Sequence, residues 1–354
     1  MRSNSKFFKK RKLIPIDKFF QNVLYDKKFG YYNSKQPFGF KGDYITSPRI
    51  SNLFSEMIAI WIISTWETFG KPKKFNIVEL GPGDGSLTKI ILSVSKKFPE
   101  FDKAKRVFLF EKSDLLKNIQ KKNLKQSEIK WIRNFDLIKE GPVAFFGNEF
   151  FDAIPIKQFK RKNKVLYEKY FELQKNFKIK EVFKKASGED TKMIDSFKTL
   201  KKLKFIEFPK YGLDKLDQII KKILKLKGCL LLIDYGYLGP NNQNTIQSVI
   251  KHKKNNILKN LGKADITSHV NFTLLKEFFI KNDLKVLKIV CQKDFLKNIG
   301  INERAEIIAK KMNFTDQVNL YLRLKRLLSP KLMGSLFKVI LAYKNESNNY
   351  FGFN

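Results

Sequence analysis

The sequence predicts an α/β fold in which helices cover both faces of a mostly parallel sheet. Short apolar runs alternate with helical patterns over most of the chain. The runs are apolar throughout rather than at every second residue, which is typical of strands buried on both faces. A glycine-rich turn, "ELGPGDGS", joins one such run to the helical segment that follows it.

The first seventy residues are expected to be mainly helical. Residues 13–32 carry the pattern of a short helix. Ser47 is a suitable N-cap for a second helix, with Pro48 at its first position, and the pattern continues to Gly70. The stretch "MIAIWIISTW" within it is about half as long as a bilayer span requires. We therefore expect a buried helix there and no membrane span.

The alternation that predicts the sheet begins after this helix. The expected strands are 75–80, 106–111, 129–135 and 141–150, with helices at 86–98 and 114–124 between them. The alternation resumes with helix 213–228, strand 229–237, helix 273–283 and strands 284–292 and 336–344.

An insertion interrupts this alternation. Segments 164–173 and 176–185 alternate apolar and polar residues, as the strands of an antiparallel hairpin do. We therefore expect five parts, which are an N-terminal helical region (1–70), the first part of the α/β core (71–159), a β-rich insertion that serves as a substrate or dimer surface (160–210), the rest of the core with a helical insertion (211–344), and a loose tail (345–354).

The strongly basic composition does not indicate a nucleic-acid partner. The net charge is +37, yet only nine of the 71 basic residues are arginine. Arginine is the residue best suited to phosphate and base contacts. The lysines are also spread along the chain rather than gathered in one stripe. Solubility and compositional drift explain this charge better than a nucleic-acid footprint does.

Metal and disulfide chemistry are not expected. Cys229 and Cys291 lie in apolar runs with no metal-binding spacing, and His252 and His269 are the only histidines. The basic N-terminus is not followed by an apolar segment of signal-peptide length. The expected location is the cytoplasm of a bacterium, or the mitochondrial matrix if the chain is eukaryotic.

The glycine-rich turn is a candidate ligand site, because bare backbone and a helix N-terminus face whatever binds there. Its residues are Glu79, Gly81, Gly83 and Gly85, in the order E-x-G-x-G-x-G. A phosphate-binding loop is excluded, because no Gly-Lys-Ser/Thr opens the helix. The form resembles motif I of class I S-adenosyl-L-methionine (SAM) methyltransferases, which implies a second acid on the ribose hydroxyls. Glu111 ends the next strand, where that acid is expected.

A second polar turn follows the strand at 141–150. Asn148, Glu149 and Asp152 lie just past its end, at the sheet edge where open α/β sheets bind ligands. They could simply cap a turn and a helix. Two carboxylates beside apolar aromatics are costly, however, unless a cation pairs with them. An arginine guanidinium fits such a pair, and Glu149, helped by Asp152, would hold it in line for methyl transfer.

The chain as a whole resembles the MidA family of SAM-dependent methyltransferases, which includes a mitochondrial complex I assembly factor. The resemblance runs from about Leu24 to Lys344. It rests on nine segments in order: "LYDKKFGYY", "GDYITSPRIS", "VELGPGDGSL", "NEFFDAIPIKQF", "LLIDYGY", "NTIQSVIKHK", "GKADITSHVNF", "CQKDFLKNIGI" and "MGSLFKVILAYK".

The resemblance implies a class I methyltransferase fold. This is a Rossmann-like, mostly parallel, seven-stranded sheet with an N-terminal helical extension and a β-rich insertion. It also implies SAM as cofactor, S-adenosyl-L-homocysteine as product, and methylation of a protein arginine to symmetric dimethylarginine on a complex I subunit in the mitochondrial members. The protein substrate would be the main partner, and a homodimer is a further expectation.

The resemblance also assigns site residues. The N-terminal region, with Gly42, Asp43, Thr46 and Ser47, is expected to close over the cofactor. The cofactor-binding residues are then Glu79, Gly81, Gly83, Gly85, Glu111, Asn148, Thr46 and Ser47. The catalytic residues are Glu149, Asp152 and His269, beside Asp265.

Three positions depart from the family pattern. Arg49 stands where Glu is usual, Asp84 replaces a basic residue in the glycine turn, and Asn271 replaces Asp. A cation at Arg49 would repel an incoming arginine unless it pairs with a neighbouring acid such as Glu56.

Other functions stay open from the sequence. The enzyme could methylate RNA or a small molecule, or the chain could be an assembly chaperone for a respiratory complex that binds SAM without essential catalysis. His269 could be a general base or a structural histidine, and the structural role is favoured because arginine methylation needs no strong base.

Overall fold

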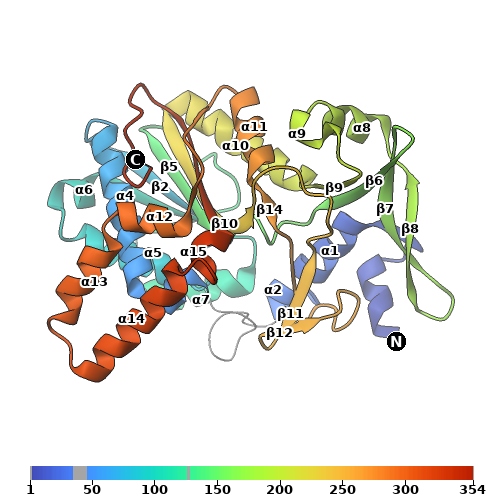
Figure 1. Ribbon diagram of the computed structural model, residues 1–354, viewed down its shortest axis with the longest axis horizontal. Helices are drawn as coiled ribbons and strands as arrows, with labels where there is room; N and C mark the ends of the chain where they lie inside the picture. The colour runs from blue at the N-terminus through green and yellow to red at the C-terminus, as the bar shows by residue number, and fades with distance from the viewer. Residues whose placement is uncertain (1, 35–45, 126–127, 354) are drawn as a thin grey trace. The chain divides into compact units, whose positions relative to one another are not determined.

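A computed structural model describes residues 2–34, 46–125 and 128–353, and it divides the chain into two compact units (Figure 1). The first unit comprises Met1–Tyr44, Phe151–Asp217 and Tyr237–Phe278, and the second comprises Ile45–Phe150, Gln218–Gly236 and Phe279–Asn354. Three elements run from one unit into the other: α10 (Lys210–Leu226), β10 (Gly228–Tyr237) and α11 (Phe272–Lys281).

The second unit is built on a sheet with the strand order β15-β17-β10-β5-β2-β3-β4. Strands β10, β5, β2, β3 and β4 are parallel, and β17 runs antiparallel to β10. Strand β2 lies between β3 and β5, so the chain order reverses there, and ligands bind at the carboxyl ends of strands around such a reversal. The register pairs Glu79 of β2 with Leu109 of β3 and with Phe146 of β5. The α/β class and the mostly parallel sheet expected from the sequence are confirmed, and in the described part of the chain the sheet holds nine strands, of which seven follow this order.

The remaining elements of this unit follow the expected alternation. Its strands are β2 (Phe75–Leu80), β3 (Lys105–Phe110), β4 (Lys130–Ile132), β5 (Val143–Asn148), β15 (Lys285–Val286), β16 (Val290–Cys291) and β17 (Phe337–Lys344). Its helices are α3 (Ser47–Ile50), α4 (Asn52–Thr68), α5 (Ser86–Ser95), α6 (Pro99–Ala104), α7 (Asp114–Leu124), α12 (Gln292–Asn298), α13 (Ile301–Ala309), α14 (Phe314–Leu328) and α15 (Met333–Leu336).

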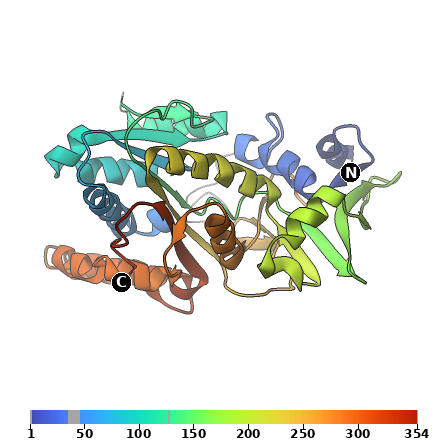
Figure 2. The same ribbon diagram turned by 90° about the horizontal axis from the view of Figure 1, so that it is seen from above.

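The apolar stretch expected to form a buried helix is α4. Its Trp61 and Ile62 are fully buried, in one cluster with Ile77 of β2 and Leu231 of β10. Helix α13 packs against both α4 and α14, as seen from above in Figure 2. Among the described residues, no helix is long and apolar enough to cross a membrane.

The single helix expected from Pro48 to Gly70 is wrong, because the chain breaks at Ser51. Thr46 rather than Ser47 is the N-cap of α3. Ser51 is extended, with φ −154° and ψ 135°, and its hydroxyl accepts a hydrogen bond from Leu53 N at 3.2 Å. A serine side chain that bonds nearby backbone competes with helix continuation and starts a new helix instead.

Two other expected elements also differ. Residues 13–32 contain β1 (Leu13–Pro15), α1 (Ile16–Tyr25) and the start of α2 (Tyr31–Ser34) rather than one helix. The strand expected at 284–292 is divided into β15 and β16. Between Val286, which faces Ala342, and Val290, which faces Val339, this strand has one residue more than β17. One extra residue makes a bulge that interrupts pairing.

The first unit contains the expected β-rich insertion. Its larger sheet has the order β1-β7-β6-β9, with β8 paired to β7. Strands β7 and β8 are antiparallel, which confirms the hairpin expected at 164–185. Helix α1 packs on β7 through Phe19 and Phe171, whose ring centroids are 4.9 Å apart. The other elements are η1 (Arg2–Phe8), β6 (Lys157–Lys162), β7 (Val165–Leu173), β8 (Ile179–Lys185), α8 (Gly188–Asp195), α9 (Lys198–Lys201), β9 (Phe205–Phe208), β11 (Gln247–Ile250), β12 (Lys253–Asn255), β13 (Asp265–Thr267) and β14 (Val270–Asn271).

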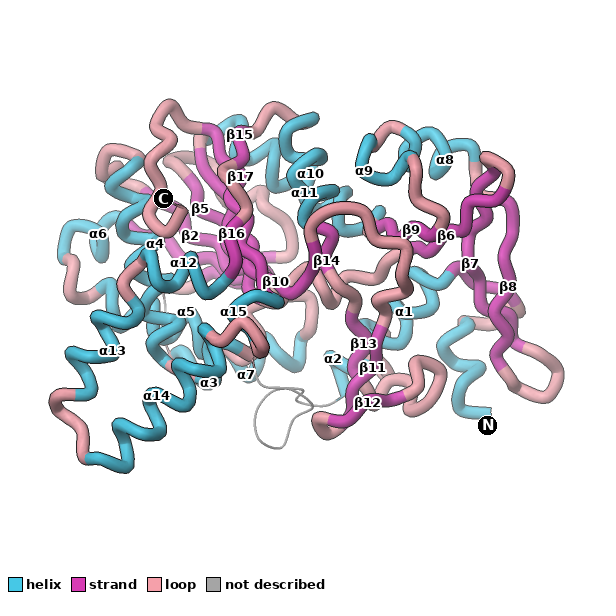
Figure 3. Tube along the Cα trace, viewed as in Figure 1, coloured by secondary structure: helices cyan, strands magenta, loops and turns pink. Residues whose placement is uncertain are grey.

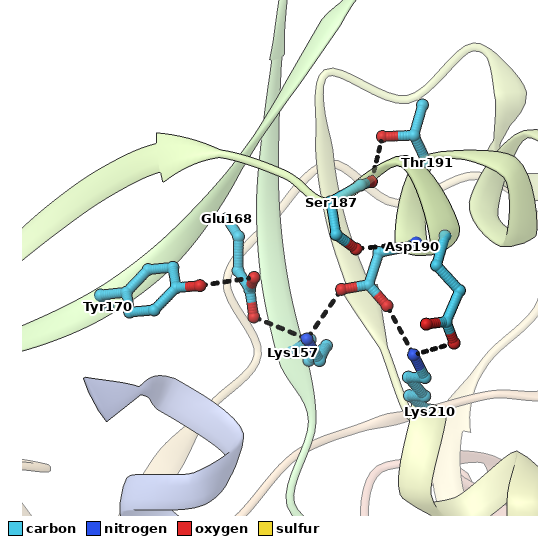
Figure 4. A network of polar contacts seen from close by, with 8 residues as sticks. Lys157, Glu168, Tyr170, Ser187, Asp190, Thr191 and Lys210 are labelled. Carbon is cyan, nitrogen blue, oxygen red and sulfur yellow. Dashed lines mark hydrogen bonds and ion pairs between the residues drawn. The ribbon is translucent and has the colours of Figure 1, made fainter. Parts of the chain in front are cut away.

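A charged network fixes this insertion from inside (Figure 4). The Lys157 ammonium lies 2.7 Å from a carboxylate oxygen of Glu168 and 2.8 Å from one of Asp190. Lys210, the first residue of α10, contacts the other Asp190 oxygen at 2.9 Å. Burial alone would raise the pKa of Asp190, but hydrogen bonds from the two lysines hold it below its ordinary value. The network therefore stabilises the join between β6, β7, α8 and α10.

Replacing Lys157 by Met should strongly destabilise the protein. The change leaves the buried carboxylates of Glu168 and Asp190 without their shared cation, which we expect to lower the free energy of unfolding by about 3–5 kcal/mol. A urea titration at pH 7 followed by circular dichroism measures this. Lys162→Met, at the exposed end of the same strand, is the control.

The difference in free energy of unfolding between Lys157→Met and the unmodified protein should shrink in acid. The lowered pKa of Asp190 means that its contribution is present above the ordinary value near 4 and is lost as the pH falls further. An unchanged unfolding midpoint for Lys157→Met at pH 7 would contradict the stabilising role of the network.

Candidate active site

The glycine turn between β2 and α5 adopts a backbone that only glycine takes up without strain. Gly81, Gly83 and Gly85 have φ values of +64°, +58° and +85°. A Cβ on Gly81 would meet the Phe150 ring at 2.9 Å, and one on Gly85 would meet Leu124 at 3.2 Å. The turn therefore presents bare backbone at the N-terminus of α5, where a polar ligand can approach closely.

Helix α7 holds this turn in place with side chains that the sequence motif did not identify. Gln120 is fully buried, and its amide donates to Gly83 O at 2.8 Å and to Glu111 Oε2 at 3.1 Å. Trp131 Nε1 donates to the Gln120 oxygen at 2.9 Å, and Asn123 donates to Asp84 O at 2.9 Å. In the sequence, the sign of these contacts is a pair of amides, Gln120 and Asn123, three residues apart on the side of α7 that faces the turn.

Two carboxylates lie beside the turn: Glu79 in β2 is buried, and Glu111, just past the end of β3, is half-buried. Glu79 accepts a hydrogen bond from the Thr88 hydroxyl in α5, and burial raises its pKa to about 8. Glu111 accepts from Ser113 N at 2.7 Å, and burial raises its pKa to about 7. Glu79 thus acts on the turn through Thr88, whereas Glu111 lies one residue past the end of β3, at the edge where a ligand binds.

Glu149 connects the end of β5 to helix α3. Its backbone is left-handed, with φ +51°, and its N–H donates to Ile233 O at 2.9 Å. Its Oε1 accepts from Ser47 N and from the Asn148 amide, both at 3.1 Å. A non-glycine residue in this conformation costs free energy, and such positions cluster at functional sites.

Two polar atoms around Glu149 point to a missing polar partner. Ser47 is fully buried, and its hydroxyl has no hydrogen bond among the residues that the structure describes. The side-chain oxygen of Asn148 likewise has no hydrogen bond among these residues. Both residues contact the same Glu149 oxygen through their nitrogen atoms. Buried polar groups are normally satisfied, and a cofactor that carries both donors and acceptors fits this place. Thr46 is the N-cap of α3 but makes no side-chain cap bond, and Gly42 and Asp43 lie outside the described residues.

Arg49 pairs with Asp84, not with Glu56. The Arg49 guanidinium contacts the Asp84 carboxylate, whose second oxygen accepts from Ser86 N at 3.1 Å. Glu56 instead pairs with Arg304 at 2.7 Å. The suggestion that Glu56 neutralises Arg49 is therefore wrong. The two residues together fasten α3 to the glycine turn.

Asp152 and His269 belong to the first unit, whereas the glycine turn, Glu111 and Glu149 belong to the second. The Asp152 carbonyl accepts from Ser268 N at 3.0 Å, and His269 N donates to the Thr245 hydroxyl at 3.0 Å. Burial lowers the pKa of His269. Its side chain lines a cavity of about 20 Å³ with Glu207 and Tyr237, which is large enough for about one water molecule.

The neighbours of His269 in the motif have structural contacts. Asp265 is buried and accepts from the Tyr32 hydroxyl at 3.1 Å. The Asn271 side-chain oxygen accepts from Leu274 N at 3.0 Å and so caps α11. Among the described residues, no group of histidine, cysteine or acidic side chains is arranged to hold a metal ion.

Comparison with known proteins gives this site its context. Residues 57–290 match the family model described as "Putative S-adenosyl-L-methionine-dependent methyltransferase". The "Protein arginine methyltransferase NDUFAF7 homolog, mitochondrial" of Caenorhabditis elegans is 33% identical over 78% of this chain and 70% of its own length. The human "Protein arginine methyltransferase NDUFAF7, mitochondrial" is 28% identical over 92% of this chain and 78% of its own length.

The fold also has a solved counterpart. The crystal structure of a COG1565 superfamily member from Burkholderia thailandensis, bound to S-adenosyl-homocysteine, covers 100% of this chain and 92% of its own. The TM-score is 0.79 at 19% sequence identity, so this likeness concerns the fold.

Glu111 should make SAM binding depend on pH. Its ionised carboxylate accepts hydrogen bonds from hydroxyls, and with a pKa of about 7 it becomes protonated as the pH falls from 8 to 6. We expect the affinity for SAM to fall by about tenfold for each pH unit below 7. Calorimetric titration with SAM at pH 6, 7 and 8 measures this. Glu111→Gln, which cannot ionise, should bind weakly at every pH and controls for titration of SAM itself. Equal pH dependence in both proteins would contradict this role.

The pairing of Arg49 with Asp84 should be required for cofactor binding. Arg49→Glu places two carboxylates together beside the glycine turn, and we expect it to weaken SAM binding by about tenfold. Adding Asp84→Lys restores opposite charges and should recover most of the affinity, which a double-mutant cycle measures as coupling. Additive effects of the two substitutions would show that the pair does not act as a unit.

Proposed function

The chain belongs to the family of S-adenosyl-L-methionine-dependent methyltransferases, and we propose that its methyl acceptor is an arginine side chain of a protein. The names of the curated relatives support this acceptor. The observation that carries it in this molecule is the Glu149 carboxylate, held at the carboxyl edge of the sheet by Ser47 and Asn148. A carboxylate at this point can receive a guanidinium and align it.

Each site residue has a proposed task. The glycine turn and Glu111 hold the nucleoside part of SAM, while Ser47 and Asn148 complete its polar contacts. When bound, SAM supplies a sulfonium methyl group that transfers to a nucleophile. Glu149 holds the acceptor guanidinium so that one nitrogen faces that methyl, and the main contribution is alignment rather than strong acid–base catalysis. A carbon–nitrogen bond forms as the carbon–sulfur bond breaks, and a proton leaves the nitrogen.

Asp152 and His269 are proposed to act on the acceptor side. Burial lowers the pKa of His269, so its imidazole is neutral at pH 7 and can accept the released proton. Asp152 would add a second carboxylate for the guanidinium. An unpaired Arg49 would repel a positively charged arginine acceptor. The pairing with Asp84 neutralises the charge of Arg49, so Arg49 does not oppose an arginine acceptor.

We further propose that the acceptor protein is a complex I-type subunit. The test incubates the purified protein with methyl-labelled SAM and the 49-kDa-type complex I subunit from the same genome. Mass spectrometry then looks for methylarginine. Label on another residue type, or none at all, would contradict the proposed acceptor.

Glu149→Gln should separate catalysis from cofactor binding. Glutamine keeps an oxygen that can accept from Ser47 N, so α3 should hold its place, but the negative charge that receives the guanidinium is lost. We expect methyl transfer to fall by at least about a hundredfold, while SAM affinity changes by less than about threefold. Activity and calorimetry measured on the same preparation decide this. Lost SAM binding would assign Glu149 to the cofactor instead, and unchanged activity would contradict its role with the acceptor.

A further inference from the structure

Helix α14 exposes an apolar stripe that the methyltransferase core does not use. The stripe consists of Phe314, Val318, Tyr321 and Leu322, which are 80%, 40%, 45% and 59% exposed. At 100° per residue these four side chains fall within about a quarter of the helix circumference. The opposite face of α14 is buried through Leu320, Leu324 and Leu327. The helix is thus apolar on two faces, and only one of them is covered.

Two cations continue the stripe for another helical turn. Lys325 lies four residues after Tyr321, and Arg326 lies four after Leu322, so both follow the same face. Both are exposed, and neither has an ion pair among the residues that the structure describes. Five other arginines do pair with acids, namely Arg49, Arg106, Arg133, Arg161 and Arg304. The helix dipole accounts for cations in the last turn of α14, but it does not account for exposed apolar side chains beside them.

A second copy of the chain does not fit this surface. If two α14 helices packed antiparallel around Val318, then Lys325 of each would lie level with the turn that precedes the other α14, where Lys311 is exposed. Parallel packing would bring Lys325 and Arg326 against their own counterparts. Like charges meet in both arrangements, which costs free energy. The complementary partner has apolar side chains for the stripe and carboxylates for Lys325 and Arg326.

The position of α14 relates this surface to the cofactor site. Within the second unit, α14 packs against α3 (Figure 3). Helix α3 carries Ser47 and Arg49, which contact Glu149 and the glycine turn. A partner held on α14 therefore lies one helix away from the residues that surround the cofactor.

We propose that the stripe of α14, with Lys325 and Arg326, docks an acidic amphipathic segment of the protein acceptor. This inference rests on the proposed function, since it supplies the contact that selects a whole protein rather than an isolated arginine. Aromatic and arginine side chains are those that contribute most at protein interfaces, and exposed apolar patches rimmed by polar residues mark such sites.

The test measures methylation kinetics of the complex I-type subunit with two double variants. Phe314→Gln/Leu322→Gln removes the stripe, and Lys325→Ala/Arg326→Ala removes the cations. All four side chains are exposed, so folding should be unaffected. Each variant should raise the KM for the subunit by about tenfold with kcat and SAM affinity unchanged. A short peptide that contains the target arginine should react equally with the unmodified protein and with both double variants. The controls are Leu137→Gln, on a side chain 58% exposed, and Lys97→Ala/Lys103→Ala.

The outcomes separate this inference from the proposed function. Methylation of the subunit with unchanged KM in both double variants overturns the docking surface and leaves the function intact. The docking surface is also overturned if the variants instead abolish binding to phosphatidylglycerol vesicles, or abolish self-association in sedimentation. No transfer to the subunit defeats the proposed acceptor. A synthetic amphipathic helix with Glu at its polar positions then decides the docking surface, and failure of the unmodified protein to bind it overturns that surface too.

Discussion

The site depends on the left-handed backbone of the glycine turn. A turn with three positive φ values between β2 and α5 forms without strain only where glycine occupies those three positions. Once it forms, parallel pairing of β2 with β3 brings Glu79 and Glu111 to the same edge of the sheet. Helix α7 then closes over the turn through Gln120 and Asn123. The proposed cofactor site is thus a consequence of sheet register and of one backbone conformation.

The contacts around this turn form a closed path. Asp84 in the turn holds Arg49 of α3, the first N–H of α3 holds the Glu149 carboxylate, and the Glu149 backbone bonds to Ile233 of β10. Strand β10 lies beside β5, which in turn lies beside β2. Each link limits the freedom of the next, so the left-handed conformation of Glu149 is maintained by its surroundings rather than by its own preference.

The sequence predicted the parts of this molecule that local rules govern. Uninterrupted apolar runs identified the buried strands, and the spacing of Glu79, Gly81, Gly83, Gly85 and Glu111 identified the turn that the structure shows. The break at Ser51 was missed because it depends on one short-range hydrogen bond, from Leu53 N to the Ser51 hydroxyl. The bulge after Val286 depends on the pairing of β17, which comes much later in the chain. The contacts of Gln120 and the partner of Arg49 needed three-dimensional proximity, which no spacing rule supplies.

The meeting of Arg49 with Asp84 has a bearing on how such chains diverge. A charge reversal at either position alone would put like charges together beside the glycine turn. The two positions are therefore expected to change together rather than one at a time. A comparison that scores positions one at a time would treat as two independent residues what the molecule uses as one interaction.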